Sequence, residues 1–109
     1  MRFKNTADID LKQLLNKANK AKNDGKFAEA EKIYRTILVS HPKSKYAHNN
    51  LGVILHSLGR NVEAIKHYKE SIKIDPNFPD TLNNYGVTLK DKGDNHQAKD
   101  CYEKAIQIN

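Results

Sequence analysis

Few residues in this 109-residue chain can crosslink it or build a large core. It has one cysteine, Cys101, so no disulfide can form within the chain, and it has no tryptophan. Hydrophobic residues make up 38% of the chain, and no run of them is long enough to span a bilayer. The first ten residues, MRFKNTADID, lack the apolar stretch of a signal peptide. These absences favour one soluble domain in a reducing, cytoplasmic setting.

The chain does contain an internal repeat. The same residue types recur along it at one constant spacing, which is the separation of Gly25 from Gly59. The columns that keep this step are Gly25, Gly59 and Gly93; Ala30, Ala64 and Ala98; Tyr34, Tyr68 and Tyr102; and Asn16, Asn50 and Asn84. A period of this length is typical of helical hairpins stacked into a solenoid, in which each hairpin packs only on its neighbours. We therefore predict an all-α fold.

The residues that interrupt each unit predict two helices per unit. Glycine ends the first helix because it adopts the left-handed conformation easily. Pro42 and Pro76 end the second helices because proline lacks a backbone donor. Asn61 and Asn95 are the predicted N-caps of two second helices. The expected helices are 8–24, 27–41, 45–58, 61–74, 79–92 and 95–108.

Small residues in the middle of the first helices predict where helices meet. They are Ala18, Gly52 and Gly86, and glycine inside a helix costs about 1 kcal/mol relative to alanine. Close approach of the second helix offsets that cost, and the tyrosine column is expected in the core beside it. A further stripe, Ala47, Leu51, Ile54 and Leu58, should face the preceding unit. Its equivalents Gln13, Lys17, Lys20 and Asp24 are polar, so we expect 11–24 to be the N-terminal end of the array.

The small residues, the aromatic column and the prolines resemble the tetratricopeptide repeat across residues 11–109. The resemblance implies an α-solenoid of three hairpins in a right-handed superhelix, with the first helices lining a concave groove. The expected units are 11–44, 45–78 and 79–109, the last incomplete, and 1–10 is a lead-in.

Carrying the concave groove of the family onto this chain gives a set of candidate peptide-binding residues. They are Lys12, Leu15, Asn16, Asn19, Lys22, Tyr46, Asn49, Asn50, Val53, His56, Asp80, Asn83, Asn84, Val87 and Lys90. Side-chain amides both donate and accept, which matches a peptide backbone. The NNLG and NNYG strings resemble the repeats of O-GlcNAc transferase and its bacterial relatives, where an asparagine ladder runs along the groove. We expect the amides to contact the partner and their loss to leave stability nearly unchanged.

Another class of these repeats grips the C-terminal carboxylate of heat-shock chaperones. The matching positions here are Leu15, Asn19, Asn50, Asp80 and Asn84. Only Asn19 and Asn50 fit that clamp, and Asp80 would repel a carboxylate. The leading hypothesis is therefore a non-catalytic module that binds an extended peptide. The alternative is the substrate-docking region of a larger enzyme, such as a glycosyltransferase.

No constellation of catalytic side chains is evident. Every glycine belongs to the repeat, which leaves no phosphate-binding loop. The five histidines form no pair at a spacing of four, and no cysteine pair accompanies them, so no metal or other cofactor is expected. Cys101 shares a column with Ile33 and His67, which suits a packing residue.

The net charge of +6 is concentrated near the N-terminus, and residues 11–44 carry eight basic and three acidic side chains. This end either attracts an acidic protein partner or is simply a solvated surface. Nucleic acid is not the expected partner, because the basic unit has no tyrosine left for stacking once Tyr34 is in the core.

The last helix is expected to expose an apolar face where a fourth unit would begin. Its members are Tyr102, Ala105, Ile106 and Ile108. We therefore expect the sequence to be the first part of a longer protein, and to form a weak homo-oligomer through this end.

Overall fold

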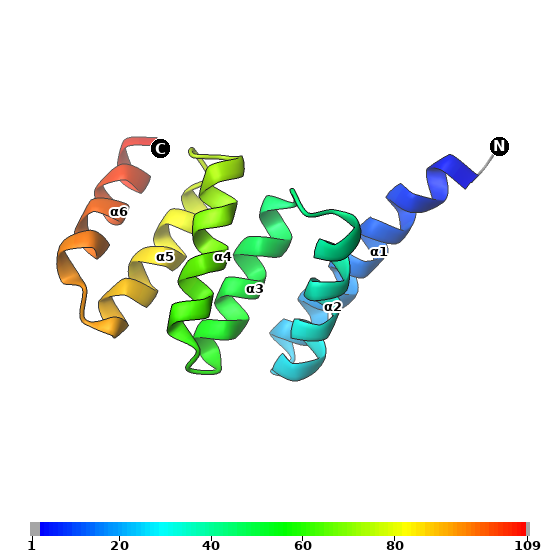
Figure 1. The fold of residues 1–109 in the computed structure, drawn as a ribbon, viewed down its shortest axis with the longest axis horizontal. Coiled ribbons are helices and arrows are strands. Elements are labelled where there is room, and N and C mark those ends of the chain that lie inside the picture. The colour runs from blue at the N-terminus through cyan, green and yellow to red at the C-terminus, as the bar shows by residue number, and fades with distance from the viewer. Residues whose placement is uncertain (1–2, 109) are drawn as a thin grey trace.

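The computed structural model describes residues 3–108, with side chains from Leu11 onward. Six helices follow one another in three antiparallel pairs (Figure 1). They are α1 (Phe3–Asn23), α2 (Phe27–Ser40), α3 (Lys45–Ser57), α4 (Asn61–Ile74), α5 (Pro79–Lys92) and α6 (Asn95–Ile108). The described chain has no strand, and the all-α prediction is confirmed. Helix α1 begins at Phe3, before the expected start at 8, so residues 3–7 extend the helix and the expected lead-in is helical from Phe3 onward.

The turn inside each pair depends on one glycine. Gly25, Gly59 and Gly93 have φ angles of 78°, 80° and 98°, in the left-handed region. Each ends a first helix, as predicted. The predicted asparagine caps are wrong, because Asn61 and Asn95 are the first residues of α4 and α6. Asp94 precedes α6, and its Oδ1 accepts a hydrogen bond of 3.4 Å from the backbone N–H of Gln97.

Each of the last two pairs is held by a tyrosine that lies on a glycine. A Cβ atom at Gly52 would lie 2.5 Å from Cε1 of Tyr68, and one at Gly86 would lie 2.8 Å from Cε1 of Tyr102. The glycines are thus needed because the rings occupy the space of a side chain. The sequence predicted that the two helices of a pair approach closely at these glycines. The structure shows that the tyrosine ring of the second helix occupies the space between them.

The three hairpins stack into an elongated row of 51 × 28 × 20 Å (Figure 1). The stripe on α3 packs as expected for Ala47, Leu51 and Ile54, which are fully buried. Leu58 differs and is 42% exposed, because it is the C-cap residue of α3. The equivalent polar residues of the first unit are exposed: Gln13, Lys17, Lys20 and Asp24.

The helices form two layers that differ in spacing. The backbone of α3 contacts both α1 and α5, whereas no such contact joins α2 to α4 or α4 to α6 within the described chain. The layer of α1, α3 and α5 is therefore the compressed, inner one. Its free face is the place where a concave groove forms.

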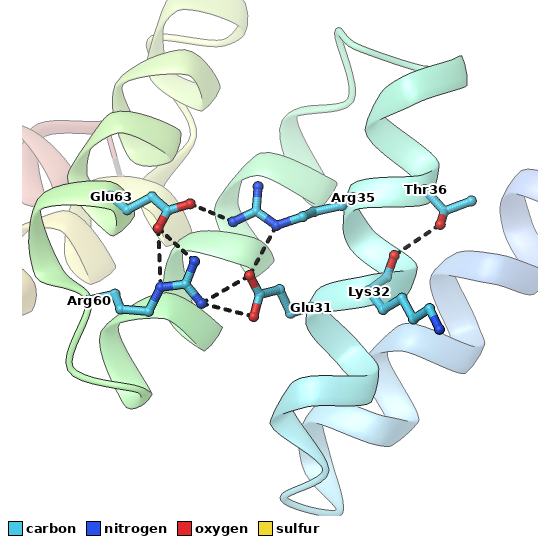
Figure 2. A network of polar contacts seen from close by, with 6 residues as sticks. All are labelled: Glu31, Lys32, Arg35, Thr36, Arg60 and Glu63. Atoms are coloured by element: carbon cyan, nitrogen blue, oxygen red, sulfur yellow. Dashed lines mark hydrogen bonds and ion pairs between the residues drawn. The ribbon is translucent and has the colours of Figure 1, made fainter.

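Across the outer layer, α2 and α4 are joined by a ring of four charged side chains (Figure 2). The Arg35 guanidinium donates to Glu31 at 3.0 Å and to Glu63 at 2.5 Å. That of Arg60 donates to the same two carboxylates at 3.0 Å and 2.7 Å. The hydrogen bonds from Arg60, and then from Arg35, lower the pKa of the Glu63 carboxyl. A network of this kind fixes the register of the first two units more firmly than isolated surface pairs would.

Two histidines from successive helices meet between α3 and α4. The Nδ1 atoms of His48 and His67 are 3.1 Å apart, and Nε2 of His48 lies 2.9 Å from the carbonyl oxygen of Pro42. Burial, and then the neighbouring His48, lower the pKa of His67 from 6.5 to about 4. No group of three or more histidine, cysteine or acidic side chains suited to a metal occurs among the described residues.

This pair predicts a loss of stability in mild acid. Because the pKa of His67 is lower in the folded chain than in the unfolded one, the unfolded state takes up the proton first, and stability falls from about pH 6.5 downward. Between about pH 7 and 5 the wild type should lose about 1 kcal/mol more free energy of unfolding than a His67→Gln variant, allowing for partial solvent screening. Urea titrations at both pH values measure this difference. The control is His96→Gln, at an exposed site, and equal losses in wild type and His67→Gln would contradict the assignment.

Candidate peptide-binding groove

The inner face of α1, α3 and α5 carries a polar hollow of about 350 Å³. Its lining residues are Lys22, Asn49, Asn50, Val53, Asp80, Asn83 and Asn84. All seven belong to the set predicted from the sequence. The hollow brings together side chains from three successive first helices, which only the stacking of the units can do.

Four amides cross the hollow as a directional chain of hydrogen bonds. Asn84 Nδ2 donates to Asn49 Oδ1 at 3.1 Å, and Asn49 Nδ2 donates to Asn50 Oδ1 at 3.3 Å. Asn50 Nδ2 then donates to Asn19 Oδ1 at 3.1 Å. The Tyr34 hydroxyl also donates to Asn19 Oδ1. Every amide in the chain is therefore held in one orientation, which lowers the entropy cost of placing it against a ligand.

Asn49 is the anchor of this amide chain. It is only 5% exposed, and its Oδ1 also accepts a hydrogen bond of 3.0 Å from the Thr81 hydroxyl. The Thr81 hydroxyl lies 2.8 Å from that of Ser71 on α4, so the network reaches the outer layer. Asn49 thus has both polar groups engaged within the fold. Asn49 therefore positions the neighbouring amides. The sequence pattern alone could not tell this structural role from direct contact with a ligand.

Other amide groups remain accessible on the same face. Asn83 is exposed and has no side-chain hydrogen bond in the described structure, and Asn16 is likewise exposed. Asn50 and Asn84 each use one Nδ2 hydrogen and keep the second, and Asn84 Oδ1 accepts no hydrogen bond within the described chain. Because Asn50 and Asn84 also link neighbouring units, the expectation that their loss leaves stability nearly unchanged has to be revised.

The remaining predicted groove residues do not line this hollow. Lys12, Val87 and Lys90 are exposed on α1 and α5. His56 is half-buried, and its Nε2 lies 2.6 Å from Asp91 Oδ2, which ties α3 to α5. Tyr46 is 53% exposed and lies on the helix face of Asn49 and Asn50, one turn earlier.

A second hollow, which the sequence did not reveal as a unit, opens beside Tyr46. It measures about 530 Å³ and its lining is largely apolar. Its lining residues are Leu11, Leu15, His41, Pro42, Lys43, Ser44 and Tyr46. Tyr46 is fixed there by the edge of the Phe78 ring, with centroids 5.5 Å apart. Leu15 and Tyr46 were expected in the groove, but the sequence predicts only the end of a helix at Pro42, in the turn between α2 and α3.

The expected apolar face at the C-terminal end is narrower than predicted. Ile106 is 74% exposed, and Tyr102 and Ile108 are half-buried. Ala105 is 2% exposed, because α6 contacts only α5 in the described chain and Ala105 lies on the side that faces it. Ala105 therefore does not belong to an exposed face, and self-association through this end stays a prediction.

Comparison with known proteins places this architecture in a family. A tetratricopeptide repeat profile matches residues 15–79, and a second profile of the same description matches residues 67–100. No curated protein gives a significant match over the chain. Among the described helices, none combines the length and apolar character needed to cross a bilayer.

Solved structures share the fold at low sequence identity. The type III secretion translocator chaperone SycD of Yersinia enterocolitica has a TM-score of 0.86 at 23% identity, with 90% of this chain and 74% of that chain covered. The second such domain of Spaghetti (RPAP3), bound to an HSP90 peptide, has a TM-score of 0.86 at 16% identity, covering 91% and 92%. The Sgt2 domain of Aspergillus fumigatus scores 0.86 at 21% identity, covering 91% and 66%. With a family profile over more than half of its residues and this shared fold, the chain belongs to the tetratricopeptide repeat family.

Proposed function

We propose that the chain is a non-catalytic module that binds an extended peptide segment of a partner protein along the inner face of α1, α3 and α5. The observation that carries the proposal is the oriented amide chain in the polar hollow, which leaves donors and acceptors of Asn50, Asn83 and Asn84 accessible. Amides of this kind match the alternating N–H and C=O groups of an extended backbone. The similarity of the NNLG and NNYG strings to O-GlcNAc transferase repeats supports the same reading.

The apolar hollow beside Tyr46 adds binding free energy that the amides alone do not provide. Three net hydrogen bonds contribute roughly 1.5–4.5 kcal/mol, whereas association costs about 4–15 kcal/mol. Burying one large aliphatic side chain of the peptide between Leu15 and Tyr46 adds about 1.5–3 kcal/mol. These gains reach only the lower end of the association cost, so we expect a weak, reversible complex in which one apolar side chain anchors a backbone held by amides and further contacts add to the affinity.

The charges of the groove favour an internal peptide segment over a chain end. Lys22 and Asp80 line the same hollow, so the site offers one charge of each sign. Asp80 would repel a terminal carboxylate at this position. Spaghetti (RPAP3) was solved with an HSP90 peptide, but Leu15 and Asp80 stand here where a carboxylate clamp needs basic residues.

The proposal predicts that removing two groove amides weakens peptide binding. The probe is the tightest 12-residue peptide selected against this chain from a random library, and its affinity is measured by fluorescence anisotropy. Asn50→Ala with Asn84→Ala should weaken binding about tenfold, as expected for the loss of one to two net hydrogen bonds.

The matched control removes two asparagines outside the groove, Asn23→Ala with Asn95→Ala, both at exposed positions. Circular dichroism at the temperature of the binding experiment checks that each variant is folded, since the groove amides also join units. Equal affinity of the folded Asn50/Asn84 variant and wild type would mean that the peptide uses another surface.

A further inference from the structure

A hollow lies beside α4 and the C-terminal end of α5, between the second and third units, and it shares no lining residue with the polar hollow of the amide chain. It measures about 310 Å³, and we name it the outer hollow. Its lining residues are Val62, Ile65, Lys66, Lys69 and Lys92. Val62 is 74% exposed, and all three lysines are exposed. Two aliphatic side chains thus lie among three ammonium groups.

Two lining residues of the outer hollow, Ile65 and Lys69, are the equivalents one repeat later of Glu31 and Arg35, which belong to the ring of charges between α2 and α4. In that ring, Arg35 donates to two carboxylates, those of Glu31 and Glu63 (Figure 2). Lys69 is the equivalent of Arg35 one repeat later and keeps the positive charge. Ile65 and Gln97 are the equivalents of the two glutamates and carry no charge. Asp94 is the equivalent of Arg60, so the second gap keeps one of the two cations, carries a carboxylate in place of the other and has lost both glutamates.

No side chain of residues 11–108 replaces those partners. Lys66, Lys69 and Lys92 form none of the ion pairs in the described part of the chain. Lys66 and Lys69 lie one helical turn apart on α4, so they are neighbours on one face and repel each other. An anionic group placed between them would relieve that repulsion.

We propose that the outer hollow is a docking surface for an acidic segment of a partner protein. Carboxylates of that segment pair with Lys66 and Lys69, and one aliphatic side chain contacts Val62 and Ile65. Charge complementarity selects the occupant, and the aliphatic residues distinguish a peptide from a nucleic acid. A single-stranded nucleic acid needs aromatic side chains for stacking, and the outer hollow has none.

A synthetic peptide tests this surface. The probe is a fluorescein-labelled 12-residue peptide of glutamate with leucine at every fourth position, and a glutamine-for-glutamate version is the uncharged comparison. Fluorescence anisotropy should show that only the acidic peptide binds, more weakly at high salt. Lys66→Gln with Lys69→Gln should weaken binding about fivefold, as expected for two exposed ion pairs. The control, Lys17→Gln with Lys32→Gln, removes the same charge from exposed sites and should leave the affinity unchanged.

Chemical-shift mapping with ¹⁵N-labelled chain locates the same peptide. The proposal expects shifts at Val62, Ile65 and Lys92, and none at Asn50 or Asn83. Equal losses in the variant and the control, absence of binding, or shifts confined to the inner face would each overturn it. Tighter binding of duplex DNA or phosphatidylserine vesicles with the same dependence on Lys66 and Lys69 would overturn it too, in favour of those ligands.

Discussion

Replacing Tyr68 with alanine is expected to lower the free energy of unfolding by about 3–5 kcal/mol. The ring is 1% exposed and occupies the space above Gly52 that a side chain would otherwise fill. Its centroid lies 6.0 Å from that of Tyr85 on α5, so it joins the second unit to the third. Alanine would leave a cavity between three helices, and rigid neighbours can close it only in part.

The hydroxyl of Tyr68 contributes a smaller part of that effect. Thr88 Oγ1 donates to Tyr68 Oη at 3.4 Å, and burial raises the pKa of this phenol to about 12. Tyr68→Phe should therefore cost about 1 kcal/mol. Tyr46→Ala, at a half-exposed ring, should cost less than about 1.5 kcal/mol. Urea denaturation followed by circular dichroism measures all three, and a loss below about 1.5 kcal/mol for Tyr68→Ala would contradict its role in the core.

Replacing Asn49 with alanine is expected to cost about 2–4 kcal/mol of unfolding free energy. The buried amide accepts hydrogen bonds from Thr81 and Asn84 and donates one to Asn50. Its removal leaves the Thr81 hydroxyl without this acceptor in a fully buried position. Three hydrogen bonds are lost at once, at about 0.5–1.5 kcal/mol each, although the Thr81 hydroxyl keeps the Ser71 hydroxyl at 2.8 Å as a partner.

The matched control for Asn49 is its column equivalent in the third unit. Asn83 occupies the same column one repeat later, is exposed, and has no side-chain hydrogen bond in the described structure. Asn83→Ala should change stability by no more than about 0.5 kcal/mol. Similar losses in the two variants, measured by thermal unfolding, would show that burial of the amide chain does not stabilise the fold.

The repeat columns predicted most of the fold because they mark the points where helices must break. Gly25, Gly59 and Gly93 fix the turns through their φ angles, which follow directly from the residue type. The start of α1 was missed because residues 3–7 belong to no repeated column. The caps at Asn61 and Asn95 were misplaced by one residue, because a side chain that can cap does so only where the backbone has the extended conformation.

The inner face was predictable as a set of residues, but its hydrogen bonds were not. The asparagine columns place amides on successive helices, and all seven lining residues of the polar hollow were expected. Asn49 is buried because α5 packs on it through Thr81 and Asn84, whereas no later first helix of the described chain packs on Asn83. The hydrogen bond between Arg35 and Glu63 likewise joins two different units. The periodicity of a single helix cannot predict such a pair.

The central claim is that the inner face of α1, α3 and α5 holds an extended peptide. Chemical-shift mapping of the ¹⁵N-labelled chain with the library-selected 12-residue peptide tests it most directly, because it reports on every backbone amide and on side-chain amides at once. We predict the largest shifts at the side-chain amides of Asn50, Asn83 and Asn84 and at the backbone of Tyr46, with little change along α2, α4 and α6. Shifts confined to those three outer helices would contradict the claim.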